Sequence, residues 1–306
     1  MTTPNDHLLQ DRATWTVVTD RAFLECPRWH DGRIWVSDLY RQEVISIGPN
    51  QRVQTEARLA DDEPSGLGWL PDGRLLITSM RNGKILRREN DGTLVVHADL
   101  SELATGKLND MVVGLDGTAY IGSFGFEFRR NSRVEPANLL RVAPDGRASV
   151  AAGDLRFPNG IVITPEGTLI VAESMGNRLT AFDIQPSGEL ASRRTWAAFG
   201  PDLPTDSVAS AMGAAAVAPD GICLDSQGAV WAADALHQRV IRVIEGGQIT
   251  DEVHFPTGVF ACMLGGDDGQ TLFACAAPSS SEKARRNTRD ASLLATTVSG
   301  THAGQP

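Results

Sequence analysis

The stretch LPDGRLLITS (residues 70–79) combines a polar turn that ends in glycine with an apolar run, and it decides the fold because it recurs. Pro, Asp and Gly favour tight turns, and a short apolar run after a turn is typical of a β-strand. Five other stretches share the pattern: WHDGRIWVSD (29–38), GLDGTAYIGS (114–123), TPEGTLIVAE (164–173), DSQGAVWAAD (225–234) and GDDGQTLFAC (266–275). The turn glycines, at positions 32, 73, 117, 167, 228 and 269, are separated by 41, 44, 50, 61 and 41 residues. This spacing is near the period of a β-propeller blade.

Most of these units are followed by a further apolar run that also ends in a turn, such as EVISIG (43–48) or RLTAFDI (178–184). Three or four strands per unit and six units predict an all-β fold, a six-bladed β-propeller that forms a single domain over residues 1–306. Two apolar runs lie outside the units, at residues 13–21 and 291–300. We expect both to be strands that close the last blade, because closure removes open sheet edges.

Composition argues against several classes of function. The formal net charge is −10 and no block of Lys or Arg occurs, which argues against a nucleic-acid partner or an anionic membrane. No apolar stretch approaches the ~20 residues that span a bilayer. The start of the sequence, MTTPNDHLLQDR, lacks the pattern of a signal peptide. We therefore expect a cytoplasmic protein, and the sequence leaves its oligomeric state open.

The four cysteines, Cys26, Cys223, Cys262 and Cys275, are far apart and include no CxxC pair. This favours reduced core residues over a zinc site or a disulfide framework.

Polar residues stand at a common offset from the turn glycines. The residues eight positions before a turn glycine are Ser65, Asn109, Asn159 and Asp220. Glu25 lies seven positions before Gly32, whereas the sixth unit has Ala261 at this place. Because the first strand of each propeller blade lines the central channel, the common offset predicts a ring of these side chains at one end of the channel, with Asp110 beside it.

Carboxylates and amides that converge without partners are costly to bury, but a cation satisfies them. Oxygen ligands without His or Cys favour Ca²⁺ first, and then Mg²⁺ or Mn²⁺. Zn²⁺ usually recruits nitrogen or sulfur and would be an alternative occupant. One divalent cation is therefore the expected cofactor. A plainer interpretation remains open, because Pro-Asn-Gly and Pro-Asp-Gly are also ordinary turn sequences.

Hairpin pairing adds polar residues near the ring. The ends of the second strands, Asp38, Glu173 or Ser174, and Asp234, are expected opposite Glu25, Asn159 and Asp220 respectively. They would either orient ligands and substrate or be polar strand ends that face solvent, and the sequence leaves both roles open.

The chain resembles the SMP-30/gluconolactonase/LRE-like family, which includes regucalcin and bacterial gluconolactonases. The resemblance extends over nearly the whole chain, and the motifs that carry it are ECPRW (25–29), KLNDM (107–111), FPNGI (157–161), APDGICLDSQGAVWAAD (218–234) and CMLGGDDGQTLFACA (262–276). It implies a six-bladed propeller with one divalent cation in the central channel. By this resemblance Glu25, Asn159 and Asp220 match the metal ligands, and Asp220 also matches the general base. Asn109 matches a position that contacts metal-bound water or substrate.

The resemblance also indicates substrate contacts. Lys107 lies where many members of the family have an arginine that contacts substrate, and Glu127 matches an acidic substrate contact. Phe124 begins the aromatic and basic segment 124–136, which we expect at the pocket rim. Three residues depart from the family pattern. Cys26 and Met111 stand where glycine is usual, and Lys107 lacks the planar fork of arginine.

Three functions are compatible with such a site. The first is a metal-dependent hydrolase that opens a small lactone, such as a sugar lactone: the cation polarises the carbonyl, Asp220 activates water, and Asn109 and Lys107 orient the substrate. The second keeps the site but acts on an organophosphate or an aryl ester, which an apolar rim would favour. The third is a non-catalytic propeller that binds calcium or another ligand, since one fold serves many functions.

Overall fold

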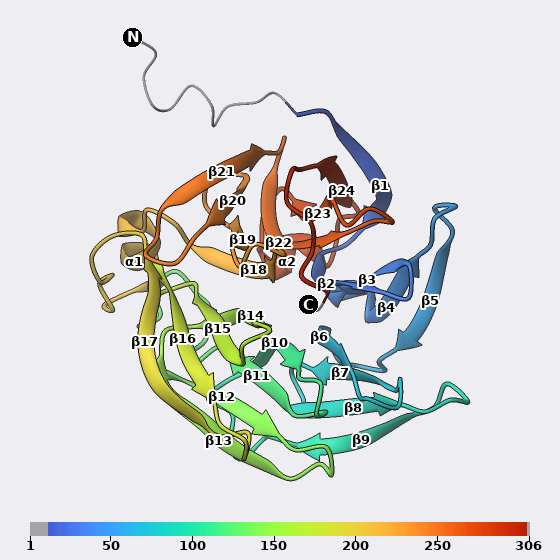
Figure 1. Ribbon diagram of the computed structural model, residues 1–306, viewed down its shortest axis with the longest axis horizontal. Helices are drawn as coiled ribbons and strands as arrows, with labels where there is room; N and C mark the ends of the chain where they lie inside the picture. The colour runs from blue at the N-terminus through green and yellow to red at the C-terminus, as the bar shows by residue number, and fades with distance from the viewer. Residues whose placement is uncertain (1–11, 305–306) are drawn as a thin grey trace.

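The computed structural model describes residues 12–304 and is nearly all β-structure. Six sheets of four strands each are arranged like blades around a central axis (Figure 1). The prediction of a six-bladed β-propeller is confirmed. Residues 1–11, which make up most of the stretch that carries the expectation about a signal peptide, lie outside the described residues.

The first five blades each consist of four consecutive strands. Blade 1 contains β2 (Leu24–His30), β3 (Arg33–Asp38), β4 (Glu43–Ile47) and β5 (Val53–Arg58). Blade 2 contains β6 (Pro64–Trp69), β7 (Leu75–Ser79), β8 (Lys84–Arg88) and β9 (Leu94–Asp99). Blade 3 contains β10 (Leu108–Val113), β11 (Ala119–Ser123), β12 (Ala137–Val142) and β13 (Ala148–Leu155). Blade 4 contains β14 (Pro158–Ile163), β15 (Thr168–Glu173), β16 (Arg178–Ile184) and β17 (Leu190–Ala198). Blade 5 contains β18 (Pro219–Leu224), β19 (Val230–Asp234), β20 (Arg239–Val243) and β21 (Ile249–His254).

The sixth blade is built from both ends of the chain. Its strands, from the channel outward, are β22 (Gly258–Gly265), β23 (Thr271–Ala277), β24 (Ala291–Thr297) and β1 (Thr14–Arg21). The two apolar runs at 13–21 and 291–300 therefore contribute neighbouring antiparallel strands. The helical segments are short: η1 (Leu39–Arg41), α1 (Val208–Ala214) and α2 (Glu282–Arg285). In the described part of the chain, no helix has the length and apolar character needed to cross a bilayer.

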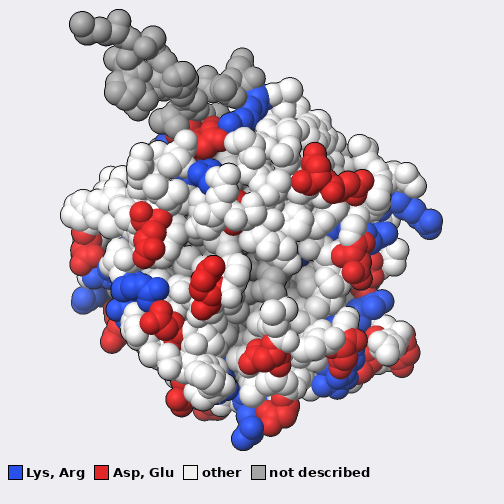
Figure 2. Space-filling model, viewed as in Figure 1, with Lys and Arg blue, Asp and Glu red and all other residues white. Residues whose placement is uncertain are grey.

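The inner strands β2, β6, β10, β14, β18 and β22 surround the axis, and each contacts the next around the ring (Figure 1). At the end of the channel where these strands finish, the C-terminal segment crosses the opening. His302 N donates to Gly269 O at 3.0 Å, and Ala303 N donates to Leu224 O at 3.2 Å. On the face in Figure 2, acidic and basic side chains are interspersed around the rim, so this face offers no continuous basic stripe of the kind that nucleic acid needs.

The turns between the first two strands of each blade explain the repeat. Gly73 and Gly167 have φ angles of +85° and +83°, a left-handed conformation that glycine adopts without strain. The turn of blade 1 is shorter, since Asp31 and Gly32 alone connect the paired residues His30 and Arg33. Both residues of this two-residue turn have positive φ, +49° and +68°. The shorter turn explains why the polar residue of this blade lies seven rather than eight positions before its glycine.

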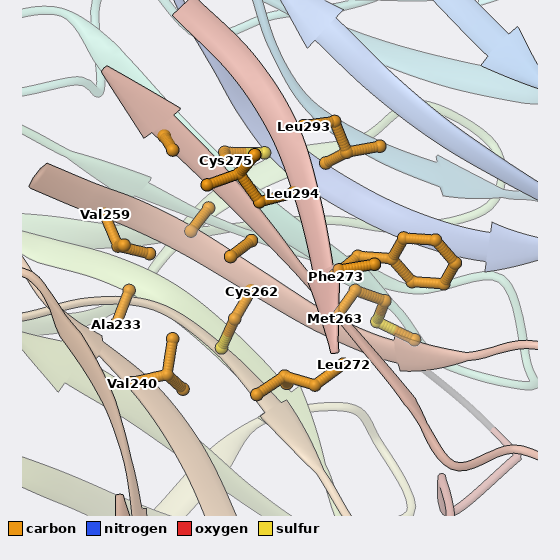
Figure 3. Close-up of a cluster of buried hydrophobic side chains, with 14 of the residues drawn as sticks. Ala233, Val240, Val259, Cys262, Met263, Leu272, Phe273, Cys275, Leu293 and Leu294 are labelled. Atoms are coloured by element: carbon orange, nitrogen blue, oxygen red, sulfur yellow. The ribbon is translucent and has the colours of Figure 1, made fainter. Parts of the chain in front are cut away.

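The hydrophobic core lies between neighbouring blades. Figure 3 shows part of one cluster, in which Val259 and Met263 of β22 pack with side chains of blade 5 and of β23 and β24. Cys262 and Cys275 are members of this cluster. All four cysteines are buried free thiols, as the sequence predicted.

Candidate active site

Five polar side chains occupy equivalent positions at the start of the inner strands. In each hairpin, the residue before the polar one pairs with the last residue of the second strand. The pairs are Leu24–Asp38, Pro64–Ser79, Leu108–Ser123, Pro158–Glu173 and Pro219–Asp234. The residues that share this register, called the ring below, are Glu25, Ser65, Asn109, Asn159 and Asp220. They lie at the end of the channel opposite to the C-terminal segment.

A β-bulge at this register brings the inner strands of blades 4 and 5 close together. In β14 the pairing with β15 shifts between Pro158 and Ile161, so Asn159 and Gly160 form the bulge. A Cβ atom on Gly160 would lie 2.4 Å from the backbone nitrogen of Ile222 and 2.6 Å from the carbonyl oxygen of Asp220. Gly160 therefore permits a close backbone approach that no other residue allows without movement of a strand.

Asn159 and Asp220 are in direct contact across this gap. The Nδ2 group of Asn159 donates hydrogen bonds to Oδ1 of Asp220 and, at 3.2 Å, to Oγ of Ser174. Ser174 in turn donates to the carbonyl oxygen of Pro219 at 2.7 Å, so the side chains of blade 4 are fixed to the backbone of blade 5. Asn159 is buried, whereas Asp220 stays partly exposed.

The carboxylates of the ring are destabilised by their surroundings. Burial, followed by the charges of Asp220 and Asp110, raises the pKa of Glu25 well above its ordinary value. Burial and then the charge of Asp110 raise the pKa of Asp220 in the same direction, although the hydrogen bond from Asn159 opposes this. These groups therefore repel one another in their ionised forms.

A divalent cation fits this donor set. The excess of negative charge at the ring is what a cation neutralises, and Glu25, Asn159 and Asp220 supply the carboxylate and amide oxygens that Ca²⁺ prefers. Within residues 12–304, no group of three or more His, Cys, Asp or Glu side chains is arranged to hold a metal ion. The candidate set consequently depends on an amide, that of Asn159, as its third ligand.

The carboxylates at the ends of the second strands do not belong to the ring. The expected pairing of Asp38 with Glu25 is wrong by one residue, because Asp38 pairs with Leu24. Side chains alternate between the faces of a strand, so this offset turns Asp38 away from the ring, and the same holds for Glu173 and Asp234. Each accepts hydrogen bonds from backbone groups that precede the inner strand: Ala22 and Phe23 for Asp38, Arg156 for Glu173, and Ala218 for Asp234. All three are fully buried, so they fix the start of the inner strands instead of facing solvent.

Two departures from the family pattern are accommodated by the fold. Cys26 has a φ of +51°, a conformation that glycine favours and that costs about 1–3 kcal/mol in other residues. Its Sγ lies 3.5 Å from Oγ of Ser65. Met111 is fully buried and packs in the core with Leu108 and Ile121.

An ion pair that the sequence reasoning missed lies three residues beyond Glu25 along β2. Nη2 of Arg28 donates to Oδ1 of Asp110 at 2.7 Å and to the carbonyl oxygen of Met111 at 2.6 Å. Nη1 donates to the carbonyl oxygen of Pro27 at 2.9 Å. Arg28 thereby joins blade 1 to blade 3, with both of the paired side chains 3% exposed. The available signal was an arginine in a channel-lining strand, since a buried guanidinium requires a carboxylate partner.

A cleft of about 1020 Å³ opens at the ring end of the molecule. Three of the four expected substrate contacts, Lys107, Phe124 and Glu127, line it, whereas the fourth, Asn109, lies outside its lining with the other ring residues. Nζ of Lys107 lies 3.8 Å from Glu63 and 3.5 Å from Glu282, so this amine is shared by two carboxylates. Glu127 is exposed at the rim.

Phe124, Phe126 and Phe128 line one side of the cleft, and the buried Phe157 packs against them. The ring of Phe157 lies 4.5 Å from that of Phe124 and 5.4 Å from that of Phe128, measured between centroids. Phe157 is a residue that sequence reasoning missed, although it stands in the FPNGI motif directly before β14. On the other side, Arg286 forms an ion pair with the buried Glu63, and its guanidinium lies 5.0 Å from the centre of the Tyr40 ring.

Comparison with known proteins identifies the family. Residues 23–277 match the model of the SMP-30/Gluconolactonase/LRE-like region, a stretch that runs from the start of blade 1 to the end of β23. The chain belongs to this family. The resemblance carried by the sequence motifs is thus confirmed.

Similar proteins include two lactonases and a calcium-binding protein. The 6-deoxy-6-sulfogluconolactonase of Pseudomonas putida is 26% identical over an alignment of 257 residues, and the alignment covers 81% of each chain. The solved structure of regucalcin from Agrobacterium tumefaciens, described as a calcium-binding protein, has a TM-score of 0.76 at 19% identity and covers 96% of this chain and 97% of its own. A gluconolactonase from Xanthomonas campestris has a TM-score of 0.70 at 22% identity and covers 95% and 91%. At such identities the two solved structures support the fold alone.

Proposed function

We propose that this protein is a metal-dependent lactonase that hydrolyses a sugar-type lactone at the ring. The observation that carries the proposal is the convergence of Glu25, Asn159 and Asp220 at one register of three inner strands, beside a cleft large enough for a small cyclic ester. The family and the similarity to the sulfogluconolactonase of Pseudomonas putida support a lactone as the substrate.

The residues of the chain have separate roles in this proposal. Glu25, Asn159 and Asp220 would hold one divalent cation, with Ca²⁺ as the first candidate. When bound, the cation would polarise the lactone carbonyl and stabilise negative charge on its oxygen. Asp220, held in place by Asn159, would accept a proton from the attacking water. The water oxygen bonds to the carbonyl carbon of the lactone, and the bond between this carbon and the ester oxygen of the lactone breaks. The proton held by Asp220 passes to the leaving ester oxygen, which gives a hydroxy acid.

Two further side chains would orient the substrate. The Nδ2 group of Asn109 lies 3.5 Å from the carbonyl oxygen of Pro158, which is at the limit of a hydrogen bond, so this donor can turn to a substrate oxygen. Lys107 would contribute a positive charge at the border between the cleft and the ring, where Phe124 supplies apolar contact and Glu127 an acceptor at the rim.

An organophosphate or aryl-ester hydrolase is a second candidate, and the aromatic wall formed by Phe124, Phe126 and Phe128 is the observation that favours it. Aromatic faces pack well against an aryl leaving group. The alternative uses the same ring, so substrate preference distinguishes the two.

The test is a pH-indicator assay on protein stripped of metal and reconstituted with Ca²⁺, Mg²⁺, Mn²⁺ or Zn²⁺. The panel contains sugar lactones with and without a sulfonate group, alkyl lactones and paraoxon. We expect metal-dependent opening of a sugar lactone, and loss of both turnover and metal in Asp220→Ala and Glu25→Gln. The matched control is Glu166→Gln, an exposed carboxylate in a turn at the other end of the channel. Metal binding without turnover of any substrate would instead support a binding protein.

A further inference from the structure

We infer that Arg28 is a positioning residue that sets the ligand count of the ring: it holds Asp110 in an ion pair and so keeps a third carboxylate out of the cation site. The inference rests on the proposed function, because it concerns the same site. Asp110 and Arg28 are not among the candidate ligands, and each has only 3% of its side chain exposed.

The position of Asp110 is unusual among the inner strands. The residue after the ring residue is glycine in blades 2, 4 and 5, at Gly66, Gly160 and Gly221. In these blades a Cβ atom would lie within 2.4–2.5 Å of the neighbouring strand. Blade 3 alone of these four carries a side chain here, and that side chain is a carboxylate.

The carboxylate of Asp110 is within electrostatic reach of both candidate carboxylate ligands. Its charge is among the causes that raise the pKa of Glu25 and the pKa of Asp220. Asp110 also directly follows the ring residue Asn109 in β10, so it lies beside the ring, and what restrains it is the set of hydrogen bonds to its Oδ1 atom. These come from Nη2 of Arg28 at 2.7 Å and from the backbone nitrogen of Met111 at 2.8 Å.

Arg28 is fixed in turn by the backbone. Its guanidinium donates to the carbonyl oxygens of Met111 and Pro27, on two different blades, so it cannot follow Asp110 toward the ring. A planar fork with several donors is needed for this arrangement, and a lysine offers a single point of charge in its place. The substitution Arg28→Lys thus keeps the charge and loses the restraint, whereas Arg28→Met loses both.

A released Asp110 would change the site in a defined direction. The affinity of oxygen-ligand calcium sites rises with the number of charged ligands, so we expect Ca²⁺ to bind about tenfold more tightly or better in Arg28→Lys and Arg28→Met. An added carboxylate also displaces water from the ion. The double variants with Asp110→Asn should return to the affinity of the parent protein.

The experiment measures Ca²⁺ affinity by calorimetry and counts ion-bound waters with Tb³⁺, from its luminescence decay in H₂O and D₂O. We expect one bound water fewer in Arg28→Lys than in the parent, and the parent value in Arg28→Lys/Asp110→Asn and in Asp110→Asn. A gain in affinity in Arg28→Met without one in Arg28→Lys would assign the effect to charge alone and overturn the inference, as would an unchanged water count. If Arg28→Met fails to fold, Arg28→Lys carries the test. Failure of the parent protein to bind either ion would overturn the proposed function instead.

Discussion

Substitution of Gly160 by alanine tests whether the close approach of β14 and β18 builds the site. The added Cβ would lie 2.4 Å from the nitrogen of Ile222, 2.6 Å from the carbonyl oxygen of Asp220 and 2.9 Å from the carbonyl carbon of Gly221. All three are backbone atoms, so no side chain can turn away to make room. The φ angle of Gly160 is not positive, so the destabilisation by alanine would arise from steric contact and not from backbone strain.

The size of the effect follows from these distances. Ordinary contacts of a Cβ begin near 3.4 Å, so the two strands must separate by about 1 Å. Overpacking of this kind costs roughly 1–3 kcal/mol. The loss of unfolded-state entropy on replacing glycine by alanine opposes it by about 0.4–1 kcal/mol. We therefore expect the free energy of unfolding to fall by about 1–2 kcal/mol. The separation also parts Asn159 from Asp220, so Ca²⁺ affinity should drop.

The assay is urea denaturation of the chelated protein, followed by calorimetry with Ca²⁺. The control is Gly213→Ala in α1, where an added Cβ meets nothing within 4 Å. Alanine favours a helix over glycine by about 0.5–1 kcal/mol, so the control should match or exceed the stability of the parent and bind Ca²⁺ equally well. Unchanged stability and affinity in Gly160→Ala would refute the argument that this glycine positions the ring.

Three further predictions concern charge. The pKa of Asp220 is raised in the folded chain, so the folded state holds this proton more tightly than the unfolded chain does. The stability of the chelated protein should therefore fall as the pH rises from about 4 toward neutrality, and it should fall less with Ca²⁺ bound or in Asp220→Asn. Urea denaturation midpoints at several pH values will show this. Glu173→Gln should lower the free energy of unfolding by about 3 kcal/mol, because Glu173 is a buried partner of Arg178. The control Glu166→Gln, at an exposed position, should change it by less than about 0.5 kcal/mol in the same urea denaturation experiments. Lys107→Met should raise KM with little change in kcat if this amine contributes only binding, which steady-state kinetics will separate.

The fold could be predicted because its signal is local. Each blade can be recognised in the sequence by a turn glycine, which has positive φ in the structure, and by the apolar run that follows it. Both features depend only on residues that are neighbours in the chain. The register of the ring is likewise a matter of counting along one strand. Even the exception, Glu25 at an offset of seven, results from the two-residue turn at Asp31 and Gly32.

What the sequence could not supply depends on contacts between strands or blades. The bulges shift the pairing of each first hairpin by one residue, so Asp38 faces away from the ring, and counting across the turn did not reveal this. The ion pair between Arg28 and Asp110 joins residues 82 apart in the chain. Phe157 contacts the aromatic residues of the cleft only because the segment 124–136 folds back on it. Such pairings follow from the three-dimensional arrangement of blades and leave no periodic trace.

The distribution of charge around the ring separates folding from function. Blade 2 has Ser65 at the ring position and blade 6 has Ala261 in the corresponding stretch, so a blade of this propeller forms without a charged residue there. Burial and mutual repulsion raise the pKa values of Glu25 and Asp220, which means that these carboxylates weaken the fold near neutral pH. In blades 1, 4 and 5 the start of the inner strand is fixed by other means, through buried carboxylates such as Glu173 that bind the preceding loop. Charged groups that destabilise a structure, in positions that the fold fills elsewhere with serine and alanine, require a reason outside folding, and binding of a cation supplies one.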